Sequence, residues 1–231
     1  IPSSNCGVYQ ISFKVAFPPA GTNEDFMTNH YPMIIDNKRI DTDKYREIRS
    51  PYDNRTLGTV PVATSKEIDL AVSVASSALI SKTFPTHERA TILDRLASAL
   101  VKHHENFAQS ISDEAAKPIA TARVEAARAV ETVQFSAAVA RTLSGDLINM
   151  EASSVGEGKT GFVKRVPIGV VGAITPFNFP LNLVCHKVAP AIAAGCPIIL
   201  KPASSTPLTA LLLGEILTTE CGLPPGWFNI V

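Results

Sequence analysis

The spacing of hydrophobic residues changes twice along the chain. Between residues 64 and 141 the apolar side chains recur every three or four positions, which is typical of amphipathic helices. From 143 to 166, glycines separate short β-prone pieces. From 167 to 231, continuous apolar runs alternate with helical spacing. We therefore expect a helical part, an extended arm and a β-α-β-α-β part, in that order.

The first helix is predicted over residues 64–82. Thr64 is a candidate N-cap, because Glu67 follows three positions later and completes a capping-box pattern. Its apolar residues on one face are Ile68, Ala71, Val72, Ala75 and Leu79. We expect that face to be buried against the rest of the protein.

Two more helices are predicted before residue 142. One begins near Thr86 and runs to about Ser112. Its apolar stripe consists of Ala90, Leu93, Leu96, Ala97, Leu100 and Val101. The other starts at Pro118, which suits a first helical turn, and continues to about Arg141. We expect the charged side chains of these helices to form solvated faces.

The N-terminal residues have a different character. The segment 32–40 predicts two short strands around a hairpin turn at Asp36 and Asn37. Residues 1–26 hold one strand-like piece and lack the order of a signal peptide. The sequence starts at Ile1 rather than Met, so we expect either an incomplete start or an extension outside the main fold.

The segment 143–166 is interpreted as a β arm. It carries four glycines between its β-prone pieces, as a long hairpin would. A ribbon of this kind builds little core of its own. We therefore expect the arm to pack on another subunit and to make the protein a homo-oligomer.

Residues 167–231 predict three strands, at 168–175, 197–202 and 227–231, joined by two helices. Apolar strands that alternate with helices indicate a parallel sheet covered on both faces, with right-handed crossovers. The fold class is therefore α/β, an incomplete doubly wound sheet of the nucleotide-binding type. Residues 27–142 are interpreted as the helical N-terminal part of the same domain.

The ends of the two connecting helices also have sequence signals. Gly195 is expected to close the first helix. Thr206 is expected to cap the second helix, which Gly222 ends. Because the sequence stops in the third strand, we expect 227–231 to form an exposed sheet edge, which favours aggregation.

Composition narrows the possible partners. Lys and Arg number 21 and Asp and Glu number 21, so no basic surface for nucleic acid or anionic membrane is indicated. The uncharged run 166–185 has nearly the length of a membrane span, but its three prolines argue against one. Four cysteines without CxxC spacing indicate free thiols in a reducing compartment, the cytoplasm. No metal site is expected.

Two loops are the candidate site, because ligands bind beyond the carboxyl ends of parallel strands. The loop 175–178 follows the first strand and the loop 201–204 follows the second. Each leads into a helix N-terminus, where free backbone N–H groups favour anions.

The residues alone leave both loops with alternatives. The amide of Asn178 could donate a hydrogen bond to an oxyanion, or the residue could cap a helix or form a turn. Lys201 could hold a phosphate or a ribose oxygen, or it could extend from the sheet edge into solvent. No GxGxxG, GxSxG, HExxH or P-loop motif is present.

The combination of PFNFP, a helix and KPA-x-x-TP within residues 167–217 closely resembles the aldehyde dehydrogenase superfamily. Earlier pieces agree, and they are MIIDNKRI, SPYDNRTLGTVPVAT, ERATILDRLASAL and EAAKPIATARVEAARAV. The resemblance covers about residues 31–231. The branch looks like the enzymes that oxidise lactaldehyde, succinate semialdehyde or glyceraldehyde 3-phosphate.

The resemblance implies oxidation of an aldehyde by NAD or NADP, in which a cysteine thiolate attacks the carbonyl and a glutamate later serves as general base. It implies that Asn178 donates to the oxyanion and that Lys201 bonds the adenosine ribose. The cofactor cleft would also involve Ile174, Thr175, Pro176, Phe177, Ala203 and Ser204.

Two departures from the family pattern are informative. Many NAD-preferring members carry a glutamate where this chain has Ser204, and a serine neither grips the ribose hydroxyls nor repels a 2′-phosphate. We therefore predict that NADP is accepted, and a preference for NADP over NAD stays open as an alternative. No cysteine here matches the nucleophile's motif, so the chain alone is not expected to be catalytically competent.

Two interpretations of function stay open at this point. The chain could be the N-terminal portion of an aldehyde dehydrogenase. Alternatively, it could be a non-catalytic remnant that binds nucleotide or a partner subunit. A dinucleotide-binding domain of another enzyme class is disfavoured by the two motifs together.

Overall fold

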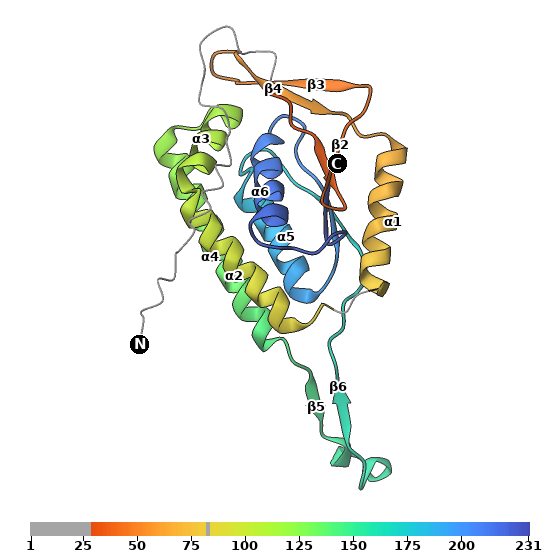
Figure 1. The fold of residues 1–231 in the computed structure, drawn as a ribbon. Coiled ribbons are helices and arrows are strands. Elements are labelled where there is room, and N and C mark those ends of the chain that lie inside the picture. The colour runs from red at the N-terminus through yellow and green to blue at the C-terminus, as the bar shows by residue number, and fades with distance from the viewer. Residues whose placement is uncertain (1–28, 82–83) are drawn as a thin grey trace, which may run out of the picture.

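The computed structural model describes residues 29–81 and 84–231, and Figure 1 shows how their elements are arranged. The predicted extension 1–26, with its strand-like piece, lies outside the described residues.

A five-stranded sheet forms the centre of the fold, in the order β2-β1-β9-β8-β7. Its parallel strands are β7 (Val171–Ile174), β8 (Ile198–Lys201) and β9 (Phe228–Ile230). The sheet is extended by β1 (Met33–Ile35), antiparallel to β9, and by β2 (Lys38–Ile40). The predicted α/β class with a parallel, nucleotide-binding type of sheet is confirmed.

The hairpin of β1 and β2 turns where the sequence predicts it. Asp36 and Asn37 both have φ of 58°, the left-handed conformation of the tight turn that matches strand twist. The hairpin covers β9, and the Asp36 N–H donates to Asn229 Oδ1 at 3.0 Å. The prediction that 227–231 forms an exposed edge is therefore wrong, because its partner comes from almost 200 residues earlier.

Helices cover both faces of the sheet (Figure 1). One face packs on α1 (Ser65–Ser81). The other packs on α5 (Asn182–Ala194) and α6 (Leu208–Thr219). An outer layer lies against α5 and α6, and it consists of α2 (Thr86–Lys102), α3 (His104–Ala115) and α4 (Ile119–Thr142).

The buried face of α1 is rotated from the predicted one. Ala71 and Ala75 are buried as expected, but Ile68 and Val72 are exposed. The small alanines let the helix approach the sheet closely, so the larger side chains lie beside the contact. At the N-terminus the capping box is confirmed, because the Thr64 N–H donates to Glu67 Oε2 at 2.8 Å.

The second predicted helix is two helices in the structure. It ends at Lys102, and α3 begins at His104. His103, at the break, has a non-helical ψ of 18°, and its Nε2 lies 2.8 Å from Glu220 Oε1. This contact with the end of α6 holds the break, and the sequence does not reveal it. The apolar stripe is buried except for Val101, which is exposed.

Two hairpins lie outside the main sheet. The strands β3 (Tyr45–Arg49) and β4 (Thr56–Pro61) pair with each other and were not predicted. The strands β5 (Asp146–Ile148) and β6 (Gly161–Val163) form the predicted arm hairpin, which ends in the short 3₁₀ turns η1 (Met150–Ala152) and η2 (Ser154–Gly156). The arm projects away from the body of the protein (Figure 1). Within the described residues, each helix is too short or too polar to cross a membrane.

Candidate functional site

The parallel register of β7 and β8 brings the two candidate loops to the same edge of the sheet. Ile174 pairs with Lys201, the last residue of each strand. The Thr175 N–H donates to the Lys201 carbonyl at 3.3 Å and continues the pairing into the loop. The loops 175–178 and 201–204 therefore leave the sheet side by side.

The first loop presents mostly exposed side chains. Ile174 is 74% exposed, and Pro176, Phe177 and Asn178 are exposed as well, whereas Thr175 is buried. Among the described residues the Asn178 side chain has no hydrogen-bond partner. The alternative that Asn178 caps α5 fails, because that helix has Leu181 as its N-cap.

A buried carboxylate caps α5 from a distant helix. Glu125 of α4 is 1% exposed, and its Oε1 accepts the N–H groups of Leu181 at 3.0 Å and Asn182 at 3.2 Å. The Glu125 Oε2 lies 2.6 Å from Lys117 Nζ. That ammonium also stands 3.9 Å from the ring centroid of Phe179, in the loop itself.

A second buried carboxylate caps α6 in the same way. Glu114 of α3 accepts the N–H groups of Leu208 at 2.8 Å and Thr209 at 3.0 Å. Burial raises the pKa of this carboxyl to about 7, against the lowering effect of these hydrogen bonds. The predicted cap by Thr206 is wrong, because its buried Oγ1 has no partner among the described residues and Pro207 stands at the N-cap.

These caps change the chemistry expected of the two helix ends. The first-turn N–H groups were predicted to be free for an anion. Instead, Glu125 and Glu114 already accept hydrogen bonds from them. The expectation that the helix charges are all solvated is also wrong for these two residues. A signal existed for Glu125, because it lies within the apolar stripe of Ala122, Ala126 and Ala129.

The second loop opens onto a cavity of about 370 Å³ at the ends of β8 and β9. It is lined by Tyr31, Met33, Arg46, Val60, Pro61, Val62, Ala63, Ile68, Lys201, Pro202, Ala203, Ser204, Pro207, Leu211, Ile230 and Val231. Three of the predicted cofactor residues, Lys201, Ala203 and Ser204, therefore share one cavity. Residues 174–178 do not line it.

The cavity is apolar with a positive rim. Its two charged side chains are Arg46 and Lys201, and no Asp or Glu side chain is among the lining residues. Lys201 is exposed, and its Nζ donates to the Pro202 carbonyl at 2.9 Å and to Ser204 Oγ at 3.2 Å. These two hydrogen bonds hold the Lys201 side chain over its own loop, so it does not extend freely into solvent.

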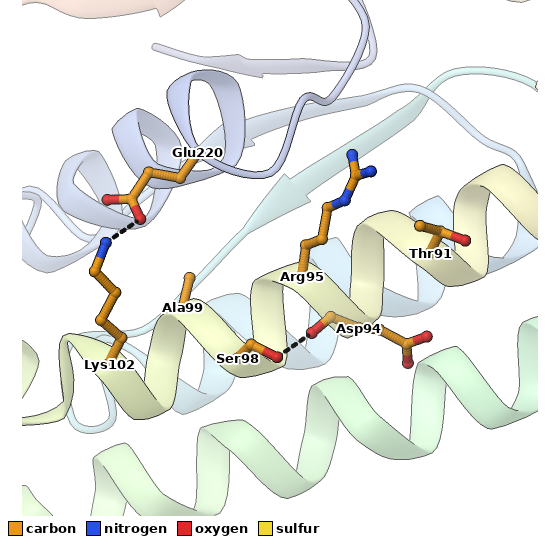
Figure 2. Close-up of a pocket in the computed structure, with 7 residues that line it drawn as sticks. All are labelled: Thr91, Asp94, Arg95, Ser98, Ala99, Lys102 and Glu220. Atoms are coloured by element: carbon orange, nitrogen blue, oxygen red, sulfur yellow. Dashed lines mark hydrogen bonds and ion pairs between the residues drawn. The ribbon is translucent and has the colours of Figure 1, made fainter. Parts of the chain in front are cut away.

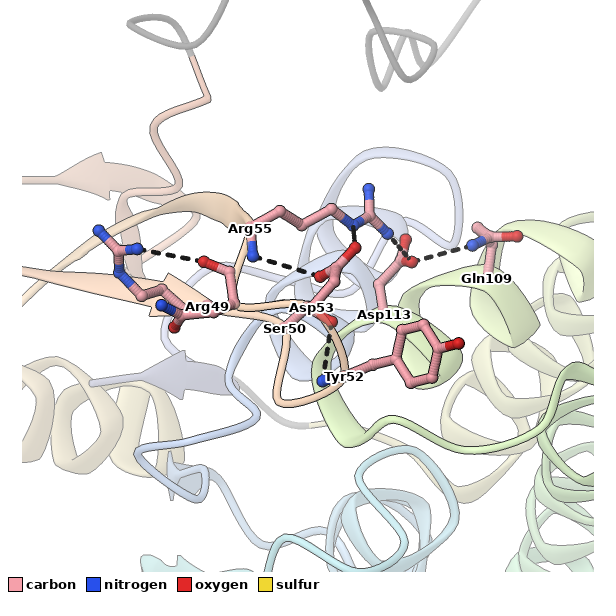
Figure 3. A network of polar contacts seen from close by, with 8 residues as sticks. Arg49, Ser50, Tyr52, Asp53, Arg55, Gln109 and Asp113 are labelled. Atoms are coloured by element: carbon pink, nitrogen blue, oxygen red, sulfur yellow. Dashed lines mark hydrogen bonds and ion pairs between the residues drawn. The ribbon is translucent and has the colours of Figure 1, made fainter.

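The strand that carries Arg46 is tethered to α3 (Figure 3). Arg55, in the turn between β3 and β4, pairs with Asp113, which also accepts a hydrogen bond from Gln109 Nε2 at 3.0 Å. Asp113 directly precedes Glu114 in the chain. The end of α3 thus holds the hairpin on one side and the start of α6 on the other. Sequence reasoning missed Arg46, because the strands around it were not predicted.

The described cysteines are unsuited to nucleophilic chemistry. Cys185, Cys196 and Cys221 are free and buried. Burial raises the pKa of Cys185 and of Cys221 to about 12, so these thiols stay protonated at neutral pH. Cys6 lies outside the described residues.

A second cavity of about 370 Å³ lies between α2 and the end of α6 (Figure 2). Its charged side chains are mostly paired with each other or with neighbours. Lys102 Nζ lies 2.9 Å from Glu220 Oε2, and Asp94 pairs with Arg141. The four charged lining side chains balance in sign, and Arg95, which has no carboxylate partner among the described residues, donates to the Cys221 carbonyl at 3.4 Å. Within the described residues, no group of three His, Cys, Asp or Glu side chains is placed to hold a metal ion.

Comparison with known proteins identifies relatives of this arrangement. The model of the aldehyde dehydrogenase family matches residues 39–231. The 3-sulfolactaldehyde dehydrogenase of Priestia aryabhattai is 38% identical over 201 residues, which are 87% of this chain and 42% of that protein.

Solved structures agree. Aldehyde dehydrogenase 21 from Physcomitrella patens, in complex with the reaction product succinate, is 41% identical with a TM-score of 0.84, over 88% of this chain and 43% of that one. An NAD-dependent aldehyde dehydrogenase from Sinorhizobium meliloti is 32% identical with a TM-score of 0.83, over 93% and 43%. The chain thus spans less than half the length of these relatives.

Proposed function

This chain belongs to the aldehyde dehydrogenase family, and from that premise we propose that it forms the cofactor-binding part of an enzyme that oxidises an aldehyde to a carboxylic acid with NADP or NAD. The observation that carries the proposal is the register of Ile174 with Lys201. It gives the Asn178 loop and the Lys201 loop one common edge of the sheet.

The cavity beside Lys201 fits the adenosine end of a dinucleotide. An ammonium and a hydroxyl, 3.2 Å apart, are suitable donors to ribose oxygens. The apolar walls suit the flat and weakly polar parts of such a ligand. When bound, the nicotinamide would supply the hydride acceptor of the reaction. The residues of this chain hold that cofactor and orient it.

We propose that NADP is accepted, and favoured over NAD. Ser204 stands where a carboxylate would repel a 2′-phosphate, and the two charges on the cavity, Arg46 and Lys201, are both positive. A dianionic phosphate is therefore attracted to this end of the sheet. The Sinorhizobium meliloti relative is NAD-dependent, so the preference for NADP over NAD has to be tested in this protein itself.

The role proposed for Asn178 is chemical. Its side-chain N–H would donate to the oxygen of the aldehyde as negative charge develops there. An exposed amide without an intramolecular partner is available for this task, whereas an amide bonded within its own turn is not. A neutral donor also needs no proton of its own to stabilise the charge.

The substrate proposed is a small aldehyde that carries a hydroxyl or an acidic group. The relatives named above act on 3-sulfolactaldehyde or bind succinate as product, and this likeness supports the class and no single member of it. A cytoplasmic location is proposed with it. The three described cysteines have no disulfide partner, as expected for a reducing compartment.

We also propose that the arm formed by β5 and β6 joins subunits of a homo-oligomer. Leu147 and Phe162, a cross-strand pair, are 79% and 77% exposed. Val155, near the tip of the arm, is 75% exposed. Apolar side chains at this exposure on a projecting hairpin favour contact with a second chain.

The test uses the intact protein and two matched pairs of variants. Asn178→Ala is expected to lower kcat for aldehyde oxidation roughly 100- to 1,000-fold, whereas Asn106→Ala, an exposed asparagine of α3, leaves it unchanged. Ser204→Glu is expected to weaken binding of 2′,5′-ADP at least about tenfold relative to 5′-AMP in calorimetry, and more than Ser205→Glu does.

Each outcome has a distinct meaning. An unchanged kcat in Asn178→Ala would reject the oxyanion role. Equal affinity of the unmodified protein for 2′,5′-ADP and 5′-AMP would reject the NADP preference alone. Binding of nucleotide without oxidation of any small aldehyde would favour the non-catalytic interpretation.

A further inference from the structure

We infer that Lys117 and Glu125 act as a positioning pair for Asn178. The inference rests on the proposed function, because it concerns how the proposed oxyanion donor is held in place. Neither residue touches the reacting atoms. Glu125 acts through backbone N–H groups at the end of the loop between β7 and α5, and Lys117 acts through the ring of Phe179 and through Glu125.

The pair fixes the loop at its downstream end. Glu125 Oε1 accepts the N–H groups of Leu181 and Asn182, three and four residues after Asn178. The same residues begin α5, so the carboxylate sets where the loop stops and the helix starts. The Leu183 N–H then donates to the Phe179 carbonyl at 3.1 Å and completes the first turn.

Lys117 fixes the loop one residue from Asn178. Its Nζ stands 3.9 Å from the ring centroid of Phe179, and Arg128 stands 5.9 Å from the same ring. A cation over an aromatic ring is attracted by the charge distribution of that ring. Because Nζ is also 2.6 Å from Glu125 Oε2, one ammonium ties the ring and the helix cap together.

The Asn178 amide depends on this support. Its side chain has no hydrogen-bond partner among the described residues, so its direction follows from the backbone around it. Thr175, at the upstream end of the loop, is held by the hydrogen bond to the Lys201 carbonyl. At the second end, the contacts of Lys117 and Glu125 act together with the hydrogen bond that Thr132 Oγ1 donates to Asn182 Oδ1 at 2.9 Å.

The cost of burying charge supports a positioning role. The side chains of Glu125 and Lys117 are 1% and 17% exposed. Apolar residues of similar volume are often as stabilising as a buried ion pair, or more so, so an ion pair here is not needed for stability alone. Apolar residues at these two positions would not accept hydrogen bonds from the two backbone N–H groups, and they would not place a cation over the Phe179 ring.

The experiment compares Lys117→Met with Lys117→Arg in the intact protein. The arginine keeps the charge for both Glu125 and the Phe179 ring, whereas the methionine keeps only the bulk. We expect Lys117→Met to lower kcat roughly 10- to 100-fold with an unchanged KM for the cofactor, because small displacements of a catalytic group cost about this much. Lys117→Arg should stay within about threefold of the unmodified protein.

Hydrogen exchange supplies a readout apart from activity. The amides of Leu181 and Asn182 should exchange faster in Lys117→Met and in Glu125→Gln. The control is Glu105→Gln, which removes an exposed ion pair of α3 with Arg123 of α4 and lies away from the loop. Its exchange at these amides and its kcat should not change.

The results separate the inference from the proposed function. A lower melting temperature of Lys117→Met with unchanged kcat and unchanged exchange at Leu181 and Asn182 would overturn the positioning role. If Asn178→Ala itself leaves kcat unchanged, the proposed function fails first. If Asn178→Ala lowers kcat and Lys117→Met does not, only the inference fails.

Discussion

Two connections, β7 to α5 and β8 to α6, are here called the two crossings. Both cap the helix with a buried glutamate, but the charges around that glutamate differ. In each, a buried glutamate from the outer helical layer accepts the first N–H groups of the helix that follows the strand. Glu125 has the ammonium of Lys117 at 2.6 Å. For Glu114 no ion pair with another described residue is present.

The cap of α6 is expected to depend on pH. Burial raises the pKa of Glu114 to about 7, and the nearby charge of Glu125 adds to the rise. The cap of α6 can therefore gain or lose its charge near neutral pH. The cap of α5 differs in that it includes the ammonium of Lys117 as a counter-ion. The two crossings therefore differ in the charges that stand beside their caps.

The largest expected effect comes from removing each cap. Glu125→Ala should lower the free energy of unfolding by about 3–5 kcal/mol, because it leaves a poorly solvated ammonium without its partner. Glu114→Ala should cost less, about 1–3 kcal/mol, since it leaves only two N–H groups unsatisfied. Urea unfolding at pH 8 measures both. Equal losses would mean that the ion pair makes no difference between the crossings.

A smaller change in the free energy of unfolding is expected when the pH is varied. The folded protein holds the Glu114 proton at pH values where the unfolded chain, with a pKa near 4.5, has released it. This contribution to stability is therefore full below about pH 4.5, falls as pH rises to about 7, and is level above that. The total change is on the order of 3 kcal/mol.

The variant Glu114→Gln isolates this contribution, because an amide cannot titrate. Glu47, Glu67, Glu105 and Glu220 have lowered pKa values and change stability in the opposite direction with pH. Those effects are common to both proteins. Unfolding curves between pH 5 and 8 should therefore diverge, with the variant less sensitive to pH. Parallel curves would show that Glu114 is ionised throughout.

The smallest effect is expected at Thr206. Its buried Oγ1 has no partner among the described residues, so Thr206→Val should change stability by less than about 0.5 kcal/mol or raise it slightly. A true N-cap would lose about 1 kcal/mol on this type of substitution. Such a loss, measured by urea unfolding, would show that Thr206 caps α6 after all. The two crossings would then not be alike.

The sequence predicted local structure correctly where the residues that determine it are neighbours in the chain. The turn at Asp36 and Asn37, the capping box of Thr64 and the end of α5 at Gly195, with φ of 78°, are of this kind. The parallel order of the three C-terminal strands follows from the alternation of strand and helix with short connections.

Long-range pairings gave no local signal of the partner, although the apolar stripe around Glu125 does indicate that this residue is buried. Glu114 caps a helix 94 residues later, and Glu125 one 56 residues later, so a pattern in either segment alone could not show them. The same holds for the hairpin that covers β9 and for the break at His103. At the site, Lys201 and Ser204 were foreseen from a motif, but Arg46 reaches the cavity from strands without one.

The two edge strands of the central sheet differ in how well they could pair with a further strand. At one border stands β2, three residues long and bearing Lys38 and Arg39, which discourage a further strand. At the other stands β7, where Gly172 and Ile174 are exposed and no described strand pairs on the outer side. Among the described residues, the β7 edge is therefore the one better suited to pair with a further strand, and it lies next to the loop of Asn178.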